Sequence, residues 1–326
     1  MRPRLGISAC LLGEPVRFDG GHKRDPYIVE VLGPHVTWVP VCPEVEAGFG
    51  TPRETMRLLS IGRPARDKSG VYRSDRVALV VHRTGEDVTG IMRAYADPRV
   101  ESLAQSHLSG FILKKDSPSC GTDGVKVYGT SGTSERVGRG IFAAALLARM
   151  PNLPVEEEGR LCDPALRENF VERVFAYQRV RQLFESAWTV GDLVKFHTAH
   201  KLTLMAHSPS AYSTLGRLVA RVRQRSRPMV AASYESVFMR ALTTIATPGR
   251  HANVLQHMLG YFKRSLDAEA RNELLRLIED HRAGRVPLVV PITRFRHHVR
   301  RLSVEYLKGQ VYLDPHPREL SLRSHV

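Results

Sequence analysis

The 326-residue sequence has no long apolar run, and this absence excludes a membrane-spanning helix. No hydrophobic stretch approaches the roughly 20 residues that such a helix needs. No internal repeat, coiled-coil heptad pattern or low-complexity tail is present either. The first residues, Met1-Arg2-Pro3-Arg4, run directly into a strand-like segment, without the apolar region or small-residue cleavage site of a signal peptide. We therefore expect a globular cytoplasmic protein with no membrane association and no obligate protein partner.

Cysteine is scarce, with four residues in the chain. Cytoplasmic thiols stay reduced, so a metal-binding or catalytic role is a better interpretation than two disulfides. Three of the four, Cys10, Cys42 and Cys120, lie in short Gly-, Pro- or Ser-rich segments. Cys162 has no such context, and we do not expect it to be a ligand. The spacing is too wide for a zinc knuckle or a ferredoxin motif, so spacing alone leaves three buried structural cysteines as an alternative.

Acidic residues are few in the second half of the chain. Residues 161–326 have 26 Lys and Arg against 14 Asp and Glu, and they provide +12 of the formal net charge of +15. They also contain 10 of the 14 histidines. Such an asymmetry between halves indicates a polyanionic partner, and nucleic acid is the first candidate. A basic, solvated helix surface without a partner is the alternative.

The first half alternates between strand-like and helical segments, which is typical of an α/β fold. Helical stretches and loops separate the apolar runs, and such alternation favours a Rossmann-like parallel sheet covered on both faces. The strand-like runs are Leu5–Ala9, Val36–Val41, Val77–Val81 and Gly110–Leu113.

A Pro- and Glu-rich hinge, 151–159, separates this half from a second one with helical periodicity throughout. We expect two domains, 1–158 and 159–326, the second an all-α bundle. Asp163-Pro164 is a helix-start signal. Among the helices predicted there are Ala165–Ala187, Thr189–Ala206, Ser210–Arg225 and Pro291–Lys308.

The three cysteines are expected to meet at one edge of the sheet. Cys10 and Cys42 directly follow strand-like runs, and Cys120 lies on the loop after a third. Ligands of parallel sheets bind outside the carboxyl ends of the strands. Three thiols at that edge would hold a metal or cluster and leave one coordination position open for chemistry.

Polar residues beside these cysteines are candidates for the same site. Glu44 and Glu46 follow Cys42, and a carboxylate there could act as general acid or base. Ser117 and Ser119 flank Pro118 just before Cys120 and could hydrogen-bond a substrate or a water. Each of these residues, taken alone, is also typical of loop capping.

Several short motifs make the first half resemble the thiouracil desulfidase family, over residues 4 to about 158. They are Ser8-Ala9-Cys10-Leu11-Leu12-Gly13, Val16-Arg17-Phe18-Asp19-Gly20, Cys42-Pro43-Glu44, Thr51-Pro52-Arg53 and Ser117-Pro118-Ser119-Cys120-Gly121. The second half resembles a domain often fused to that family, through Phe196-His197-Thr198-Ala199-His200-Lys201, Leu204-Met205-Ala206-His207-Ser208, Tyr212 and Leu215-Gly216. The combination is similar to bacterial desulfidases that remove sulfur from 4-thiouridine in tRNA.

The resemblance implies a 4Fe–4S cluster bound by Cys10, Cys42 and Cys120, with the fourth iron free to bind a thiocarbonyl sulfur. Water would replace the sulfur without electron transfer, and sulfide would be released. The resemblance places the catalytic acid at Glu44 and a substrate-orienting or proton-relaying role at Ser117. Ser119 is a less favoured candidate for that role. Relatives often read Cys-Pro-Glu-Val-Leu-Gly-Gly, whereas this chain has an extra acid, Glu46, which could contact the substrate.

The basic half fits an RNA substrate, because a free base needs no such charge to bind. Arg217, Arg221 and Arg225 repeat at helical spacing, as do Arg296 and Arg300, so each set is expected to line one helix face as an RNA-binding surface. His197, His200 and His207 are predicted to be buried or RNA-facing rather than zinc ligands, because no carboxylate or cysteine lies near them in the sequence. Three alternatives stay open: a desulfidase for free thiouracil or a similar thioamide, an iron–sulfur regulator that binds nucleic acid, and a zinc protein.

Overall fold

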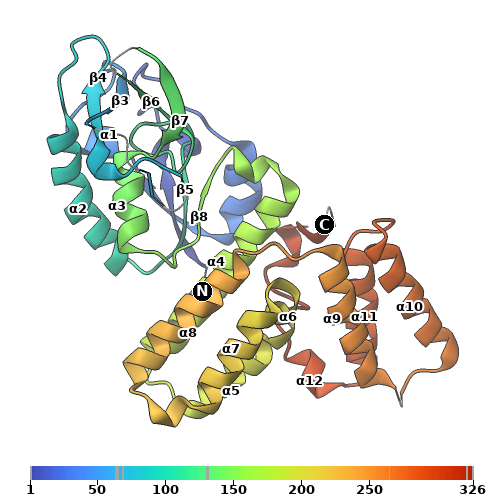
Figure 1. Cartoon of the computed structure of the whole chain (residues 1–326). Coiled ribbons are helices and arrows are strands. Elements are labelled where there is room, and N and C mark those ends of the chain that lie inside the picture. The colour runs from blue at the N-terminus through green and yellow to red at the C-terminus, as the bar shows by residue number, and fades with distance from the viewer. Residues whose placement is uncertain are drawn as a thin grey trace. The chain divides into compact units, whose positions relative to one another are not determined.

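A computed structural model describes residues 2–62, 66–67, 70–129, 132–263, 265–320 and 322–324. The chain forms two compact units, Met1–Cys162 and Asp163–Val326 (Figure 1). The first contains a parallel sheet, and the described part of the second is helical. The predicted fold class, an α/β unit followed by an all-α unit, is therefore confirmed.

The parallel sheet of the first unit has the strand order β2-β1-β5-β8. All three pairings are parallel, so the strands end at the same edge. Gly6 of β1 leaves room for the Phe111 ring of β5, which a Cβ would approach to 2.2 Å. The strand bounds are Arg4–Ser8 (β1), Thr37–Val41 (β2), Leu108–Leu113 (β5) and Val155–Glu157 (β8).

A second sheet was not foreseen from the sequence. Its order is β4-β3-β6-β7, with one parallel pair and two antiparallel pairs. The predicted strand Val77–Val81 forms, but it pairs antiparallel with β3 and does not extend the parallel sheet. The bounds are Met56–Ser60 (β3), Val77–Val81 (β4), Val125–Tyr128 (β6) and Ser134–Gly138 (β7).

Helices α2 and α3 of the first unit pack side by side (Figure 1). The apolar side chains of α2 contact β4 and β5, and Ile141 of α3 joins the core around the second sheet. The helix bounds are Pro43–Glu46 (α1), Thr89–Gln105 (α2) and Ile141–Arg149 (α3), with a π-helical segment at Tyr27–Leu32.

The second unit is a helical bundle with its own core. Its first helix begins after Asp163, whose carboxylate accepts hydrogen bonds from the backbone N–H groups of Ala165 and Leu166. The bounds are Pro164–Glu185 (α4), Val190–Ala199 (α5), Lys201–His207 (α6), Pro209–Ala220 (α7), Arg227–Leu242 (α8), Pro248–Leu259 (α9), Ala268–Arg282 (α10), Val289–Arg301 (α11) and Glu305–Lys308 (α12).

The predicted continuous helix Thr189–Ala206 is wrong, because the chain breaks at His200. The last carbonyls of α5 bond to a distant segment instead of the next helical turn. Val311 donates its backbone N–H to the carbonyl of Ala199 at 2.9 Å, and Gln310 donates from its side chain to Thr198 at 2.8 Å. A tertiary contact therefore ends the helix where the local sequence would continue it.

No helix in the part of the chain that the structure describes is long and apolar enough to span a membrane.

Candidate functional site

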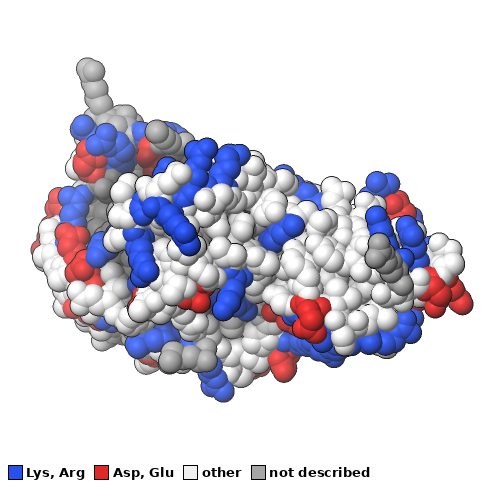
Figure 2. All heavy atoms as spheres, turned by 90° about the horizontal axis from the view of Figure 1, so that it is seen from below, with Lys and Arg blue, Asp and Glu red and all other residues white. Residues whose placement is uncertain are grey.

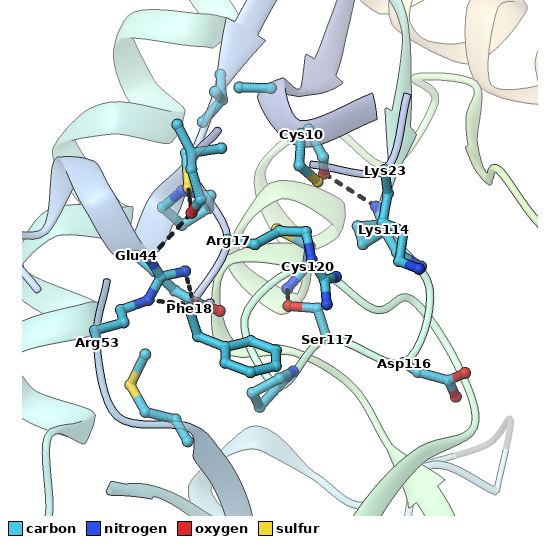
Figure 3. A pocket seen from close by; sticks show the side chains of 18 of the residues that line it. Cys10, Arg17, Phe18, Lys23, Glu44, Arg53, Lys114, Asp116, Ser117 and Cys120 are labelled. Carbon is cyan, nitrogen blue, oxygen red and sulfur yellow. Dashed lines mark hydrogen bonds and ion pairs between the residues drawn. The ribbon is translucent and has the colours of Figure 1, made fainter. Parts of the chain in front are cut away.

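Three cysteines line one cavity of about 360 Å³ in the first unit. Cys10 lies in the short 3-10 turn that follows β1, Cys42 follows β2 directly, and Cys120 lies on the loop after β5. Because these strands are neighbours in a parallel sheet, their carboxyl ends bring the three thiols to one cavity. Figure 3 shows Cys10 and Cys120 there. All three thiols are free, and Cys10 and Cys120 are buried.

The loop that carries Cys120 is held by the start of α3. Gly140 and Ile141 donate backbone hydrogen bonds to the carbonyls of Gly121 and Pro118, at 2.8 and 3.1 Å. The contact is so close that a Cβ at Gly140 would lie 2.4 Å from the carbonyl carbon of Ser119. Glycine at this position is therefore a requirement of the loop that positions the third thiol.

Burial and mutual repulsion disfavour the ionised form of these thiols when no cation is bound. Burial raises the pKa of Cys10 to about 11, with a further increase from Cys42. Burial likewise raises the pKa of Cys120, to which Glu44, Cys42 and Cys10 add. Positive charge acts in the opposite direction, since Lys114 and Arg17 lower the pKa of Cys10. A bound metal centre would supply the charge that three clustered thiolates need.

The thiols line one cavity without converging on one point. Within the described residues, no three His, Cys, Asp or Glu side chains lie close enough to hold a single metal ion. A cluster differs in this respect, because each thiolate binds a separate iron atom. The donor set of three soft sulfur atoms beside open volume therefore fits a cluster better than one zinc ion.

Glu44 lines the same cavity and is bound by Arg53. The Arg53 Nε donates to Glu44 Oε2 at 2.8 Å, and a second guanidinium nitrogen contacts the same oxygen. Arg53 also donates to the carbonyls of Val16 and Gly50, at 3.0 and 2.9 Å. Both side chains are largely buried, with 7% and 15% of the Arg53 and Glu44 side chains exposed. The pair therefore fixes a carboxylate on the wall of the cavity (Figure 3).

Ser117 also lines the cavity, and its hydroxyl oxygen organises the turn before the third thiol. The oxygen accepts hydrogen bonds from the backbone N–H groups of Ser119 and Cys120, at 3.2 and 3.1 Å. A hydroxyl that accepts in this way keeps its own proton to donate. Ser117 can thus offer a proton to a group bound in the cavity.

Two other candidate residues do not line the cavity. The Glu46 carboxylate accepts hydrogen bonds from the Cys42 backbone N–H at 3.0 Å and from the Tyr95 hydroxyl at 2.7 Å, and it pairs with Arg99. Ser119 is fully buried, and its hydroxyl has no hydrogen-bond partner within the described residues. The structure thus gives Glu46 a role in positioning α1 against α2 rather than in contacting a substrate.

Cationic and aromatic side chains that the sequence analysis left without a role complete the cavity wall. Arg17, Lys23 and Lys114 line it, and Phe18 lies across its opening with 39% of its surface exposed (Figure 3). The Lys114 ammonium pairs with Glu158. The sequence contained a signal for three of these residues, because Arg17 and Phe18 lie inside a motif and Lys114 directly follows the buried strand β5; it contained none for Lys23.

The prediction that Arg217, Arg221 and Arg225 line one face of a single helix is wrong. Helix α7 ends at Ala220, and Arg225 has extended backbone angles, φ −135° and ψ 157°. The backbone is also extended at Ser226, φ −66° and ψ 146°, and a new helix begins at Arg227. Arg217, Arg221 and Arg225 are exposed but do not form one helical stripe.

The second arginine set lines a cavity of about 750 Å³ in the helical unit. Arg296 bonds to the Leu313 carbonyl and pairs with Asp314 at 3.0 Å, and burial lowers its pKa to about 10. Arg300 and Arg301 are exposed and have no ion pair within the described residues. We call this cavity the arginine cleft, lined by Arg296, Arg300, Arg301, Arg318 and Arg323 together with His297 and His316. Lys and Arg clearly outnumber Asp and Glu on the face seen in Figure 2.

The three signature histidines occupy different environments. His200 is buried and stacks on Phe196, with ring centres 4.0 Å apart. His207 is also buried, and its Nε2 lies 3.2 Å from a Glu172 carboxylate oxygen, so a carboxylate that is distant in sequence does approach it. His197 is partly accessible, and its Nδ1 lies 3.1 Å from the Tyr234 hydroxyl.

Comparisons with known proteins divide the chain in the same way. The model of the 2-thiouracil desulfurase family matches residues 5–158, and that of "Protein of unknown function (DUF1722)" matches residues 201–317. YbgA of Escherichia coli (strain K12) is 34% identical over 152 residues, which cover 46% of this chain and 90% of YbgA. YbbK of Bacillus subtilis (strain 168) is 33% identical over 140 residues, 43% of this chain and 87% of YbbK. A solved structure of a "[4Fe-4S]-dependent thiouracil desulfidase TudS" is 29% identical, with a TM-score of 0.38 over 52% of this chain and 100% of that one.

Proposed function

This chain belongs to the 2-thiouracil desulfurase family, and on that premise we propose that it is an iron–sulfur-dependent desulfidase acting on 4-thiouridine in tRNA. The observation that carries the enzymatic part is the cavity that three thiols, Glu44 and Ser117 line together. The proposed reaction is hydrolytic: water supplies the oxygen of the new carbonyl and two protons, and the thiocarbonyl sulfur leaves as hydrogen sulfide. No electrons are exchanged, so no reductant is required.

Cys10, Cys42 and Cys120 are the residues that would hold the cofactor. A 4Fe–4S cluster bound there would supply a Lewis-acidic iron, the chemistry that polarises a C=S bond. Arg17 and Lys114 favour the thiolate form of Cys10 electrostatically, which suits this ligand role. The TudS description names the same cofactor for that protein.

Glu44 is positioned to manage the proton of the attacking water. Its pairing with Arg53 holds the carboxylate against the cavity while leaving it largely dry, which strengthens its electrostatic effect. Ser117 donates a hydrogen bond from its hydroxyl to the pyrimidine ring as charge develops on it. Phe18 offers an aromatic face at the cavity mouth on which a pyrimidine ring can pack.

The charge of the helical unit supports tRNA as the substrate. Residues 161–326 have a net charge of +12, and the arginine cleft has two cations without an internal partner within the described residues. Polyanion binding explains this excess, whereas a free thiobase would make no use of it. The target nucleotide would have to be unstacked to reach the thiols.

Turnover measured under anaerobic conditions tests both the desulfidase activity and the choice of tRNA as the substrate. Reconstituted protein receives bulk tRNA containing 4-thiouridine, and the loss of thiouridine absorbance is followed together with sulfide release; free 2-thiouracil and free 4-thiouridine are run in parallel. We expect turnover on tRNA with a far higher kcat/KM than on the free compounds. Efficient turnover of the free base alone would leave a small-molecule desulfidase. An intact cluster without turnover of any substrate would favour the regulator.

A further inference from the structure

The ammonium group of Lys201, the first residue of α6, contacts two tyrosine rings. Its Nζ lies 5.8 Å from the centre of the Tyr212 ring and 5.9 Å from the centre of the Tyr306 ring. It has no ion pair and no hydrogen-bond acceptor within the residues that the structure describes. Helices α6, α7 and α9 contain no Asp or Glu. Helices α5 and α12 contain Asp192 and Glu305, but Asp192 bonds to Thr189 and Glu305 pairs with Lys308. The described residues therefore leave the Lys201 ammonium free to bind an anion from outside the chain.

Two histidines beside Lys201 remain neutral and so do not repel it strongly. Burial lowers the pKa of His197, and the Lys201 charge lowers it further. The same two causes lower the pKa of His257. A neutral imidazole can donate one hydrogen bond to an anion held at the ammonium. The surroundings therefore combine one full positive charge with additional polar hydrogens.

Each tyrosine ring near this cation is packed against a second ring. The Tyr212 ring is parallel to that of His197, with centres 5.8 Å apart and an interplanar angle of 6°. The Tyr306 ring stacks on that of Tyr261, with centres 4.7 Å apart, and Tyr261 is 39% exposed. The Lys201 cluster is the set His197, Lys201, Tyr212, His257, Tyr261 and Tyr306, and each member is at least partly accessible.

We propose that the Lys201 cluster is a second RNA contact, which binds one backbone phosphate of tRNA at Lys201 and stacks an adjacent unpaired base on a tyrosine ring. This inference rests on the proposed tRNA substrate. A lysine with aromatic neighbours could serve packing alone, but packing requires neither a cation that is unpaired within the described residues nor an exposed ring such as that of Tyr261. Cationic grooves with aromatic platforms are the usual means of binding unpaired nucleotides. The arginine cleft, by contrast, has no tyrosine in its lining and would contact backbone only.

The first test measures tRNA affinity of the full-length, cluster-loaded protein over a series of salt concentrations. We expect Lys201→Gln to weaken binding about tenfold near 0.1 M salt and to reduce the slope of log K against log salt by about one. Lys195→Gln is the matched control, because Lys195 is exposed on the neighbouring helix α5 outside the cluster. Its affinity should stay within about twofold of the wild type. Equal affinity and slope for Lys201→Gln and wild type would overturn the inference.

The stacking part has its own pair of variants. Tyr261→Leu should weaken tRNA binding at least about fivefold, whereas Tyr261→Phe, which keeps the ring, should not. Equal binding by both variants would contradict stacking at this ring. Turnover of a free thiobase should be the same for all variants, because the cysteine-lined cavity lies in the first unit and the Lys201 cluster in the second. A wild type that converts free thiobase but neither binds nor converts tRNA would overturn the tRNA function itself, a result distinct from a silent Lys201→Gln.

A free nucleotide also has a phosphate and a base, so it is the alternative ligand for the Lys201 cluster. Titration with uridine 5′-monophosphate separates the two, because one phosphate and one base should bind only in the millimolar range if the natural ligand is a folded RNA. Micromolar binding that is lost in Lys201→Gln would instead indicate a small-nucleotide site and overturn the assignment to RNA.

Discussion

The Arg53 guanidinium binds the Glu44 carboxylate through two nitrogens on the wall of the cysteine-lined cavity. Arg53 also bonds to the carbonyls of Val16 and Gly50, so one side chain joins the carboxylate to two loops. The position of the proposed acid–base group thus depends on a residue nine positions away in the sequence.

Arg53→Ala should therefore cost both stability and activity. Removing one partner of a largely buried ion pair costs about 3–5 kcal/mol in unfolding free energy. Urea unfolding measures this loss, and Arg73→Ala is the control, because Arg73 pairs with Asp75 at the exposed surface. Arg53→Lys should recover part of the stability but less of the activity, since an ammonium cannot bind in the bidentate manner. An unfolding free energy of Arg53→Ala equal to that of the wild type would refute the structural role of Arg53.

The three cavity cysteines should determine iron content. Replacement of Cys10, Cys42 or Cys120 by Ala should each abolish a stable cluster and the brown colour of anaerobic protein. Cys162→Ala should leave iron and sulfide content at the wild-type level, because Cys162 is exposed and outside the cavity. Iron and acid-labile sulfide analysis measures both. Full cluster content in Cys120→Ala would exclude the three-thiol ligand set.

Glu44 and Glu46 should differ in what they control. Glu44→Gln should retain the cluster but lower kcat about 10²–10⁴-fold, the usual contribution of a general acid–base. Glu46→Gln should retain most of kcat and lower stability, since its carboxylate bonds to Cys42, Tyr95 and Arg99. Steady-state kinetics and thermal unfolding of both variants give the comparison. A larger kcat loss in Glu46→Gln would reverse the assignment.

The buried His207–Glu172 pair should make the helical unit less stable as pH rises. Burial alone would lower the pKa of His207, but Glu172 raises it overall, so its stabilising charge is present below pH 6.5 and is lost above the raised value. Burial, opposed by Arg323 and reinforced by Glu172, raises the pKa of Glu168 to about 7, and this too costs stability as pH rises above 4.5. The interaction with His207 lowers the pKa of Glu172 although this carboxylate is buried. The stability that the charged Glu172 contributes is therefore lost only in acid.

Hydrogen exchange of the α4 and α6 amides measures this effect. Protection, corrected for intrinsic exchange, should fall between pH 5 and pH 8 in the wild type. Glu172→Gln should be less protected at pH 5 and have a smaller pH slope, since burial then leaves His207 uncharged. The same slope in both proteins would show that the pair does not titrate with folding.

Local sequence determined the strands, several helix starts and the placement of the three thiols at one edge of the sheet. The apolar runs before Cys10 and Cys42 are β-strands as predicted, β1 buried and β2 at the sheet edge with only Val41 buried, and Pro164 begins a helix. These features follow from short-range properties, namely β-branched runs and capping residues. The parallel order then brings the strand ends together, which is why three distant cysteines could be assigned to one site.

Tertiary structure decided the features that depend on partners distant in the sequence. The break at His200 arises from Gln310 and Val311, the role of Glu46 from Tyr95, and the environment of Lys201 from Tyr306. A sequence pattern records the residue but not the group that will face it. Long-range packing selects those partners, because only the folded chain excludes water from between them and makes each contact energetically significant.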